Sequence, residues 1–142
     1  LYAMAGVRLG YGISSDPAVI EKLERSVQPW NISSLAQEAG IAALQEDFFV
    51  EKSLEGLHRE HAFLMDALQQ MNVTVYASEA NYIFFRGPED LGKQLLTEGF
   101  LVRDCSNYPG LTKGYYRIAV RLHPENEALV QAMKQLLDQR NT

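Results

Sequence analysis

The sequence lacks several features that mark whole classes of protein. Its one cysteine, Cys105, cannot form a disulfide within the chain, so a reducing, cytoplasmic setting is expected. It has no run of about 18 apolar residues, so we expect no membrane span. Acidic residues outnumber basic ones, and the net charge of −5 argues against a nucleic-acid binder or a protein of anionic membrane surfaces, because both need a positive field.

Signals at the start of the chain are missing too. No basic residue precedes the first apolar stretch and no cleavage pattern follows it, so a signal peptide is not expected. The chain opens at Leu1, without an initiator methionine and inside a patterned segment, which predicts a fragment of a longer protein.

Metal ligands at suitable spacing are also scarce. His58 and His61 are three residues apart, but no cysteine or carboxylate at ligand spacing completes a set, so no metal site is predicted. His61 falls on an apolar stripe, where a packed histidine is the better interpretation, and His123 marks a helix boundary. Cys105 follows Arg103, whose charge would lower the pKa of a thiol, yet no catalytic partner for a cysteine nucleophile is visible.

What remains is a globular composition, with 46% hydrophobic and 22% charged residues. Residues 7–13 read as a short strand. Helices are predicted over 14–27, with Ser15 or Asp16 as cap and Pro17 in the first turn, and over 35–46, capped by Ser33 or Ser34. A longer helix of about 37 Å is predicted from Asp47 to Met71. Its apolar stripe has a 3-4-3-4-3 spacing through Leu54, Leu57, His61, Leu64, Leu68 and Met71.

After Met71 the apolar period changes to two. Strands are predicted over 73–85 with a break at 78–81, over 101–105 and over 115–122, with helices over 88–100 and from Pro124 onward. This order predicts a small sheet with helices on one face, within an α/β chain whose C-terminal part is of the α+β kind. A change of composition near residues 46–50 marks a boundary between two regions.

Arginines on the predicted strands are the candidate binding residues. Alternation over 115–122 places Arg117 and Arg121 on the side opposite the core, and Arg103 lies on the strand 101–105. Guanidinium groups bind carboxylates and phosphates in a bidentate manner, which favours a small anionic ligand. Alternatively, these arginines lie on a solvated face and pair with surface acids. Arg8, flanked by Gly6 and Gly10, has the same two interpretations.

The segment "LYAMAGVRLGY" carries a family resemblance. It resembles the stretch that follows the cofactor lysine in fold-type I pyridoxal-phosphate enzymes of the class I/II aminotransferase group, with the aromatic residue, glycines, arginine and tyrosine in register. The resemblance implies that Arg8 contacts the cofactor phosphate. It also implies that the cofactor lysine would fall one residue before Leu1, so that this chain holds no catalytic residue and is inactive alone.

Later motifs narrow the resemblance within that group. "SEANYIFF" is similar to the small-domain strand of histidinol-phosphate aminotransferases, and "LVRDCSNYPGL", "YYRIAVR" and "ENEALVQAM" are most similar to the threonine-phosphate decarboxylases of cobalamin synthesis. The resemblance implies that Arg103 binds a substrate phosphate and that Arg117 binds the α-carboxylate. Decarboxylation is the first expectation and transamination of histidinol phosphate or another amino acid the second.

The resemblance also implies a domain plan and partners. Residues 1–46 would end the large pyridoxal-phosphate domain, 47–71 would form the interdomain helix, and 72–142 would form the small domain with a mostly antiparallel sheet. The implied cofactor is pyridoxal 5'-phosphate, the substrate a phosphorylated amino acid or amine, and the assembly a homodimer, with no nucleic acid or membrane partner. A standalone α+β binding module without cofactor is the alternative of another class.

Overall fold

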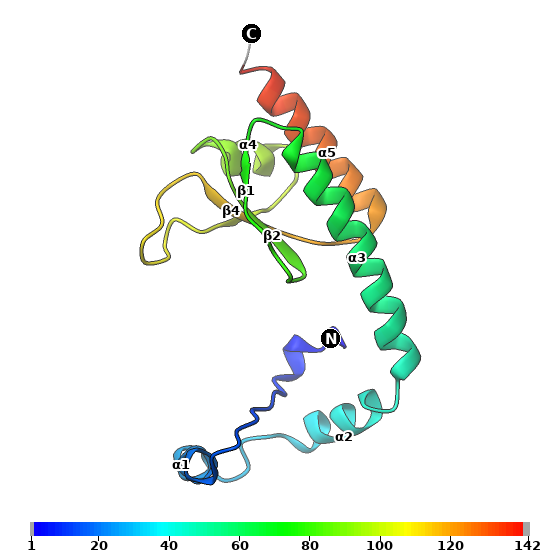
Figure 1. The fold of residues 1–142 in the computed structure, drawn as a ribbon, viewed down its shortest axis with the longest axis vertical. Helices are drawn as coiled ribbons and strands as arrows, with labels where there is room; N and C mark the ends of the chain where they lie inside the picture. Colours follow the sequence, from blue (N-terminus) through cyan, green and yellow to red (C-terminus); the bar gives the residue numbers. More distant parts are fainter. Residues whose placement is uncertain (1, 141–142) are drawn as a thin grey trace. The chain divides into compact units, whose positions relative to one another are not determined.

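The computed structural model describes residues 2–140 and divides the chain into two compact units, Leu1–Ser53 and Leu54–Thr142. Figure 1 traces the elements along the chain. Among the described residues, no helix is both long enough and apolar enough to cross a membrane. The predicted domain bounds 1–46, 47–71 and 72–142 stay predictions.

The first unit consists of short helices. The 3₁₀-helix η1 spans Ala5–Val7, α1 spans Pro17–Ser26 and α2 spans Ser34–Ala43. Asp16 caps α1 by accepting a hydrogen bond from the N–H of Ala18 at 2.9 Å, and Ser33 caps α2 by accepting one from the N–H of Ala36 at 3.2 Å. Both helix starts were therefore predicted correctly, because a side-chain cap is a local signal.

The predicted strand over 7–13 is wrong. The described structure has η1 over Ala5–Val7 and no regular element from there to α1. Arg8 ends η1 in the left-handed region at φ 60°, and its N–H bonds to the carbonyl of Ala5. A strand needs a neighbouring strand to take up its backbone hydrogen bonds, and none is present among the described residues of the first unit.

The long helix α3 spans Asp47–Gln69, and the division between the units falls inside it. It begins at the predicted residue and ends two residues before Met71. In the second unit, its Leu64 and Leu68 are fully buried, whereas Leu54 at the start of the predicted stripe is partly exposed. Only the later turns of the helix therefore bury the stripe within the second unit.

The second unit contains one four-stranded sheet. Its strands are β1 (Thr74–Val75), β2 (Tyr82–Arg86), β3 (Arg103–Asp104) and β4 (Tyr115–Ala119), arranged in the order β1-β2-β4-β3 with every pair antiparallel. The predicted break at residues 78–81 separates β1 from β2. Helix α4 spans Leu91–Thr97, starting after Pro88 rather than at it, and α5 spans His123–Asp138. The predicted antiparallel sheet with helices is confirmed.

The core of the second unit lies on one face of the sheet. Figure 1 shows α3 and α5 running side by side against it. Tyr116 of β4 is nearly fully buried, and its hydroxyl lies 2.8 Å from the carbonyl of Glu89. Burying one such large side chain stabilises the fold by about 2–3 kcal/mol. The fully or nearly fully buried core side chains are Leu64, Leu68, Ile83, Phe85, Leu91, Leu95, Tyr116, Ile118 and Met133.

Candidate functional site

The face of the sheet opposite this core carries arginines and aromatic rings. In β4, Tyr116 and Ile118 point into the core, so Tyr115, Arg117 and Ala119 lie on the open face. The same alternation in β2 places Tyr82, Phe84 and Arg86 there. Rings of Tyr76, Phe84 and Tyr115 stack on one another along this face, with centroids 5.1–6.3 Å apart. The predicted alternation over 115–119 is confirmed.

Arg103 and Arg117 are direct register partners across β3 and β4. Side chains at such positions have Cβ atoms about 4.5–5.5 Å apart, and like charges directly opposite one another destabilise a sheet. Within the part of the chain that the structure describes, neither guanidinium has a carboxylate partner. Two adjacent positive charges that form no ion pair are a site that an anion would stabilise.

An aromatic ring contacts each of these two arginines. The Cζ atom of Arg117 lies 4.3 Å from the centroid of the Tyr82 ring, and that of Arg103 lies 5.6 Å from the centroid of Tyr108. Arg103 also donates from Nη2 to Oδ1 of Asn107 at 3.3 Å. Contacts of this kind orient a guanidinium without neutralising its charge.

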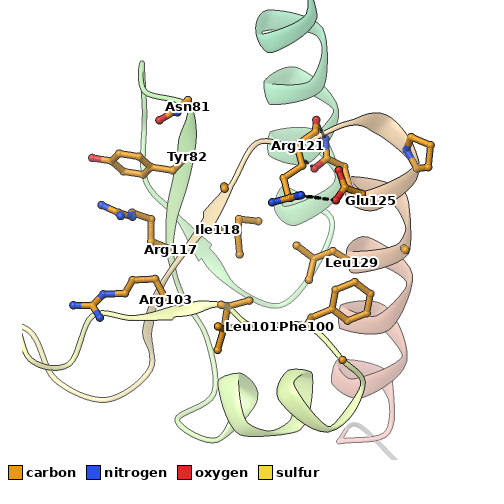
Figure 2. A pocket seen from close by; sticks show the side chains of 16 residues that line it. Asn81, Tyr82, Phe100, Leu101, Arg103, Arg117, Ile118, Arg121, Glu125 and Leu129 are labelled. Carbon is orange, nitrogen blue, oxygen red and sulfur yellow. Dashed lines mark hydrogen bonds and ion pairs between the residues drawn. The ribbon is translucent and has the colours of Figure 1, made fainter. Parts of the chain in front are cut away.

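Two hollows border the arginines. The larger, about 820 Å³, is lined by Tyr82, Arg103 and Arg117 together with apolar side chains such as Phe100 and Leu129. Figure 2 shows Tyr82, Arg117 and Arg103 one below another at one side of this hollow, with the ends of their side chains pointing away from Ile118, Leu129 and Phe100 on its other side. A second hollow of about 660 Å³ shares Tyr82 and Arg117 and adds polar groups of the loops 77–80 and 105–108. Either volume is large enough for a small organic anion.

Arg121 behaves differently from its two neighbours. Its guanidinium forms an ion pair with Glu125 at 2.7 Å, in the first turn of α5, and that pair raises the pKa of Arg121 (Figure 2). The prediction that Arg121 shares the open face of the strand with Arg117 is wrong, because β4 ends at Ala119 and the chain turns into α5. The surface-pairing interpretation is therefore correct for Arg121, whereas for Arg103 and Arg117 the described residues form no ion pair.

Arg8 belongs to the first unit. It is exposed, has no carboxylate partner among the described residues, and donates from Nη1 to the carbonyl of Ala5 at 3.2 Å. A Cβ placed at Gly6 or Gly10 would meet no heavy atom within 4 Å, so nothing described here makes the close approach that flanking glycines would permit. The role of Arg8 at a cofactor phosphate, and its meeting with Arg103 and Arg117, stay predictions.

Cys105 lines the second hollow but is almost fully buried. Burial raises the pKa of its thiol, and the opposing charges of Arg117 and Arg103 do not compensate. The sequence-based expectation that Arg103 lowers this pKa is therefore outweighed by loss of solvent. A thiol kept protonated is a poor nucleophile, so the structure gives Cys105 no reactive role.

Sequence reasoning missed a buried polar cluster at the junction of α3 and α5. Glu60 is 4% exposed, and its Oε2 accepts from Nδ2 of Asn126 at 3.1 Å and lies 3.0 Å from Nδ1 of His123. Burial alone would raise the pKa of Glu60, but the hydrogen bonds of Asn126, His123 and Arg59 lower it overall. The sequence spacing could have predicted this burial, because Glu60 lies four residues before Leu64 and therefore on the same, buried side of α3.

Tyr82 and Tyr108 were also missed as partners of the arginines. Alternation in the segment 82–86 places Tyr82 on the open face, but the sequence does not show which side chain of another strand lies beside it.

Comparisons with known proteins give one consistent family. The sequence profile of the family described as Aminotransferase class I and II matches residues 1–134. The chain is 40% identical to threonine-phosphate decarboxylase of Salmonella typhimurium over 140 residues, which is 96% of this chain and 38% of that protein. It is 32% identical to histidinol-phosphate aminotransferase of Methanosphaera stadtmanae over 142 residues, which is 95% of this chain and 38% of that protein.

Solved structures that superpose on this chain include enzymes with the same two names. Histidinol-phosphate aminotransferase from Clostridium acetobutylicum superposes with a TM-score of 0.88 at 29% identity, covering 96% of this chain and 43% of that one. L-threonine-O-3-phosphate decarboxylase from Porphyromonas gingivalis superposes with a TM-score of 0.75 at 25% identity, covering 87% and 40%. The chain thus spans about 38% of the length of the curated relatives it matches.

Proposed function

Because this chain belongs to the class I and II aminotransferase family, we propose that it is part of a pyridoxal-phosphate-dependent enzyme and forms the side of the site that binds substrate anions. The observation that carries the proposal is the opposed pair Arg103 and Arg117, which has no carboxylate partner among residues 2–140 and borders a hollow of about 820 Å³. We propose a homodimer in the cytoplasm as its setting.

Each of three arginines is assigned one anionic group to bind. Arg117 binds the α-carboxylate of the substrate and Arg103 binds its phosphate, each through guanidinium N–H groups. Arg8 fits a contact to the cofactor phosphate, since its guanidinium is exposed and no carboxylate of the described residues neutralises it. When bound, pyridoxal phosphate supplies the electron sink for the bond broken at the substrate Cα. We expect this chain alone to be inactive.

Threonine-phosphate decarboxylation is the first candidate reaction. L-threonine O-3-phosphate carries a carboxylate and a phosphate on one small molecule, so a single substrate engages Arg117 and Arg103 together. The 40% identity to a threonine-phosphate decarboxylase supports this choice. By fixing the direction of the carboxylate, Arg117 limits which bond at Cα is aligned for cleavage.

Histidinol-phosphate transamination is the second candidate, favoured by the TM-score of 0.88 to such an enzyme. Histidinol phosphate has a phosphate but no carboxylate. Arg117 would then bind a carboxylate of the amino acid or oxo acid that reacts in the other half-reaction. The full-length enzyme distinguishes the two reactions. Release of CO₂ and aminopropanol phosphate from threonine phosphate supports the first, and oxoglutarate-dependent turnover of histidinol phosphate without CO₂ reverses the order.

Substitution of Arg117 tests its assigned role. In the full-length enzyme, Arg117→Gln should lower kcat/KM for the carboxylate substrate by about 100-fold, since a charge-assisted, bidentate contact is lost. Arg121→Gln is the matched control, because Arg121 borders the same hollow but is paired with Glu125, and it should change kcat/KM by no more than about threefold. Equal effects of the two variants would contradict the proposal.

A further inference from the structure

The contact between Tyr82 and Arg117 arises from the register of β2 and β4. Tyr82 is the direct partner of Ala119, and Phe84 is the direct partner of Arg117, so Tyr82 and Arg117 are diagonal neighbours on the open face. Diagonal neighbours are about 7–8 Å apart at the backbone, within reach of long side chains. The short side chain of Ala119, directly opposite Tyr82, leaves room for the Arg117 side chain to extend over the ring.

The chemistry of this contact differs from that of an ion pair. A guanidinium presents a flat face and an edge of N–H donors. The Tyr82 ring lies 4.3 Å from Cζ of Arg117, and no group of the described residues accepts a hydrogen bond from the Arg117 donors. Glu125, by contrast, occupies donors of Arg121 and cancels its charge. An aromatic contact restrains Arg117 while leaving both its charge and its donors available to a ligand.

The two rings contact their arginines unequally. Tyr108 lies 5.6 Å from Cζ of Arg103, and Arg103 already has a hydrogen bond to Asn107. Tyr82 lies closer to its arginine, and it borders both hollows beside Arg117. Removal of the ring at position 82 therefore removes the ring contact that restrains the Arg117 guanidinium, whereas Arg103 keeps its hydrogen bond to Asn107.

We propose that Tyr82 is a positioning residue for Arg117. Its ring holds the guanidinium in an orientation in which the N–H edge is free to take the substrate carboxylate, and it lowers the conformational entropy lost on binding. This inference rests on the proposed function and names a residue that the function itself does not require.

The test uses the full-length enzyme with Tyr82→Phe and Tyr82→Leu. Tyr82→Leu should raise KM for threonine phosphate about 2.3- to 30-fold, the range that a loss of about 0.5–2 kcal/mol of cation–π attraction gives. Tyr82→Phe keeps the ring and should stay within about twofold of the wild type.

A second readout separates positioning from a purely structural role. Aminopropanol phosphate lacks the carboxylate, so its inhibition constant should not change in Tyr82→Leu. A parallel rise in KM and in this constant would overturn the inference. Should Tyr82→Leu fail to fold, progressively fluorinated phenylalanines at position 82 keep the shape and weaken the ring's attraction for cations. KM should then rise stepwise with fluorination, and an unchanged KM overturns the inference.

Comparison with Arg117→Gln shows which idea has failed. If Arg117→Gln raises KM but Tyr82→Leu does not, the positioning role is wrong and the proposed function stands. If neither variant affects carboxylate binding, the proposed function is wrong.

Discussion

The two units of the chain bury their apolar residues very differently. In Leu54–Thr142, three helices and a sheet enclose a continuous core that includes Phe85, Leu64 and Met133 at no measurable exposure. Among the described residues of the unit Leu1–Ser53, the buried hydrophobic ones are Ala36 and Ala43, while Trp30 is 96% and Tyr11 92% exposed. Within the described residues, the helices α1 and α2 of the first unit bury no large apolar side chain, whereas the second unit has a closed hydrophobic core.

This difference teaches that correct local signals do not by themselves stabilise a region. The side chains of Asp16 and Ser33 cap α1 and α2 as predicted, yet neither helix encloses a large apolar residue. Isolated helices of about ten residues are marginal in water, and most helical stability in proteins comes from tertiary packing. We therefore expect stability in this chain to be concentrated in the second unit.

Separating the units should give the largest effect. A segment of residues 54–142 should unfold cooperatively on heating, while a segment of residues 1–53 should show no cooperative transition, because only the former contains a hydrophobic core. Circular dichroism and calorimetry on each segment measure this. A sharp transition in the 1–53 segment, or none in the 54–142 segment, would break the comparison.

A matched pair of phenylalanine variants should give the next largest effect. Phe85→Ala removes a fully buried ring from β2 and should lower the free energy of unfolding by about 3–5 kcal/mol. Phe48→Ala, at a side chain 74% exposed in the first unit, should change it by less than about 0.5 kcal/mol. Urea denaturation of the 142-residue chain measures both. Similar losses would show that the first unit has a core of its own.

The smallest effect concerns the acid stability of the second unit. The pKa of Glu60 is held below its ordinary value of 4.5, so its carboxylate stabilises the fold above that pH, and this contribution is lost as pH falls through the folded-state pKa. The melting temperature of Glu60→Gln should therefore lie a few degrees below that of the wild type near neutral pH and approach it below about pH 4.5. Glu127→Gln, at an exposed position of α5, is the control. A difference in melting temperature between Glu60→Gln and the wild type that grows as the pH falls would contradict the lowered pKa of Glu60.

Much of the fold could be predicted from the sequence because its signals are local. Side-chain caps, the stripe on α3 and the alternation in β4 depend on residues a few positions apart. The strand predicted over 7–13 failed because strand formation depends on a partner outside the segment. The resemblance to class I/II aminotransferases is confirmed by the family match, whereas the roles of Arg8, Arg103 and Arg117 stay predictions.

The sequence by itself determined the family, the helices and the face on which Arg117 lies. Only the tertiary structure decided that Arg103 lies directly opposite Arg117, that the Tyr82 ring contacts Arg117, and that Arg121 is paired with Glu125. The physical reason is that charge pairing and ring contacts depend on the register between strands and on where a strand ends. The period of two along one strand predicts neither its register with the next strand nor the residue at which it ends.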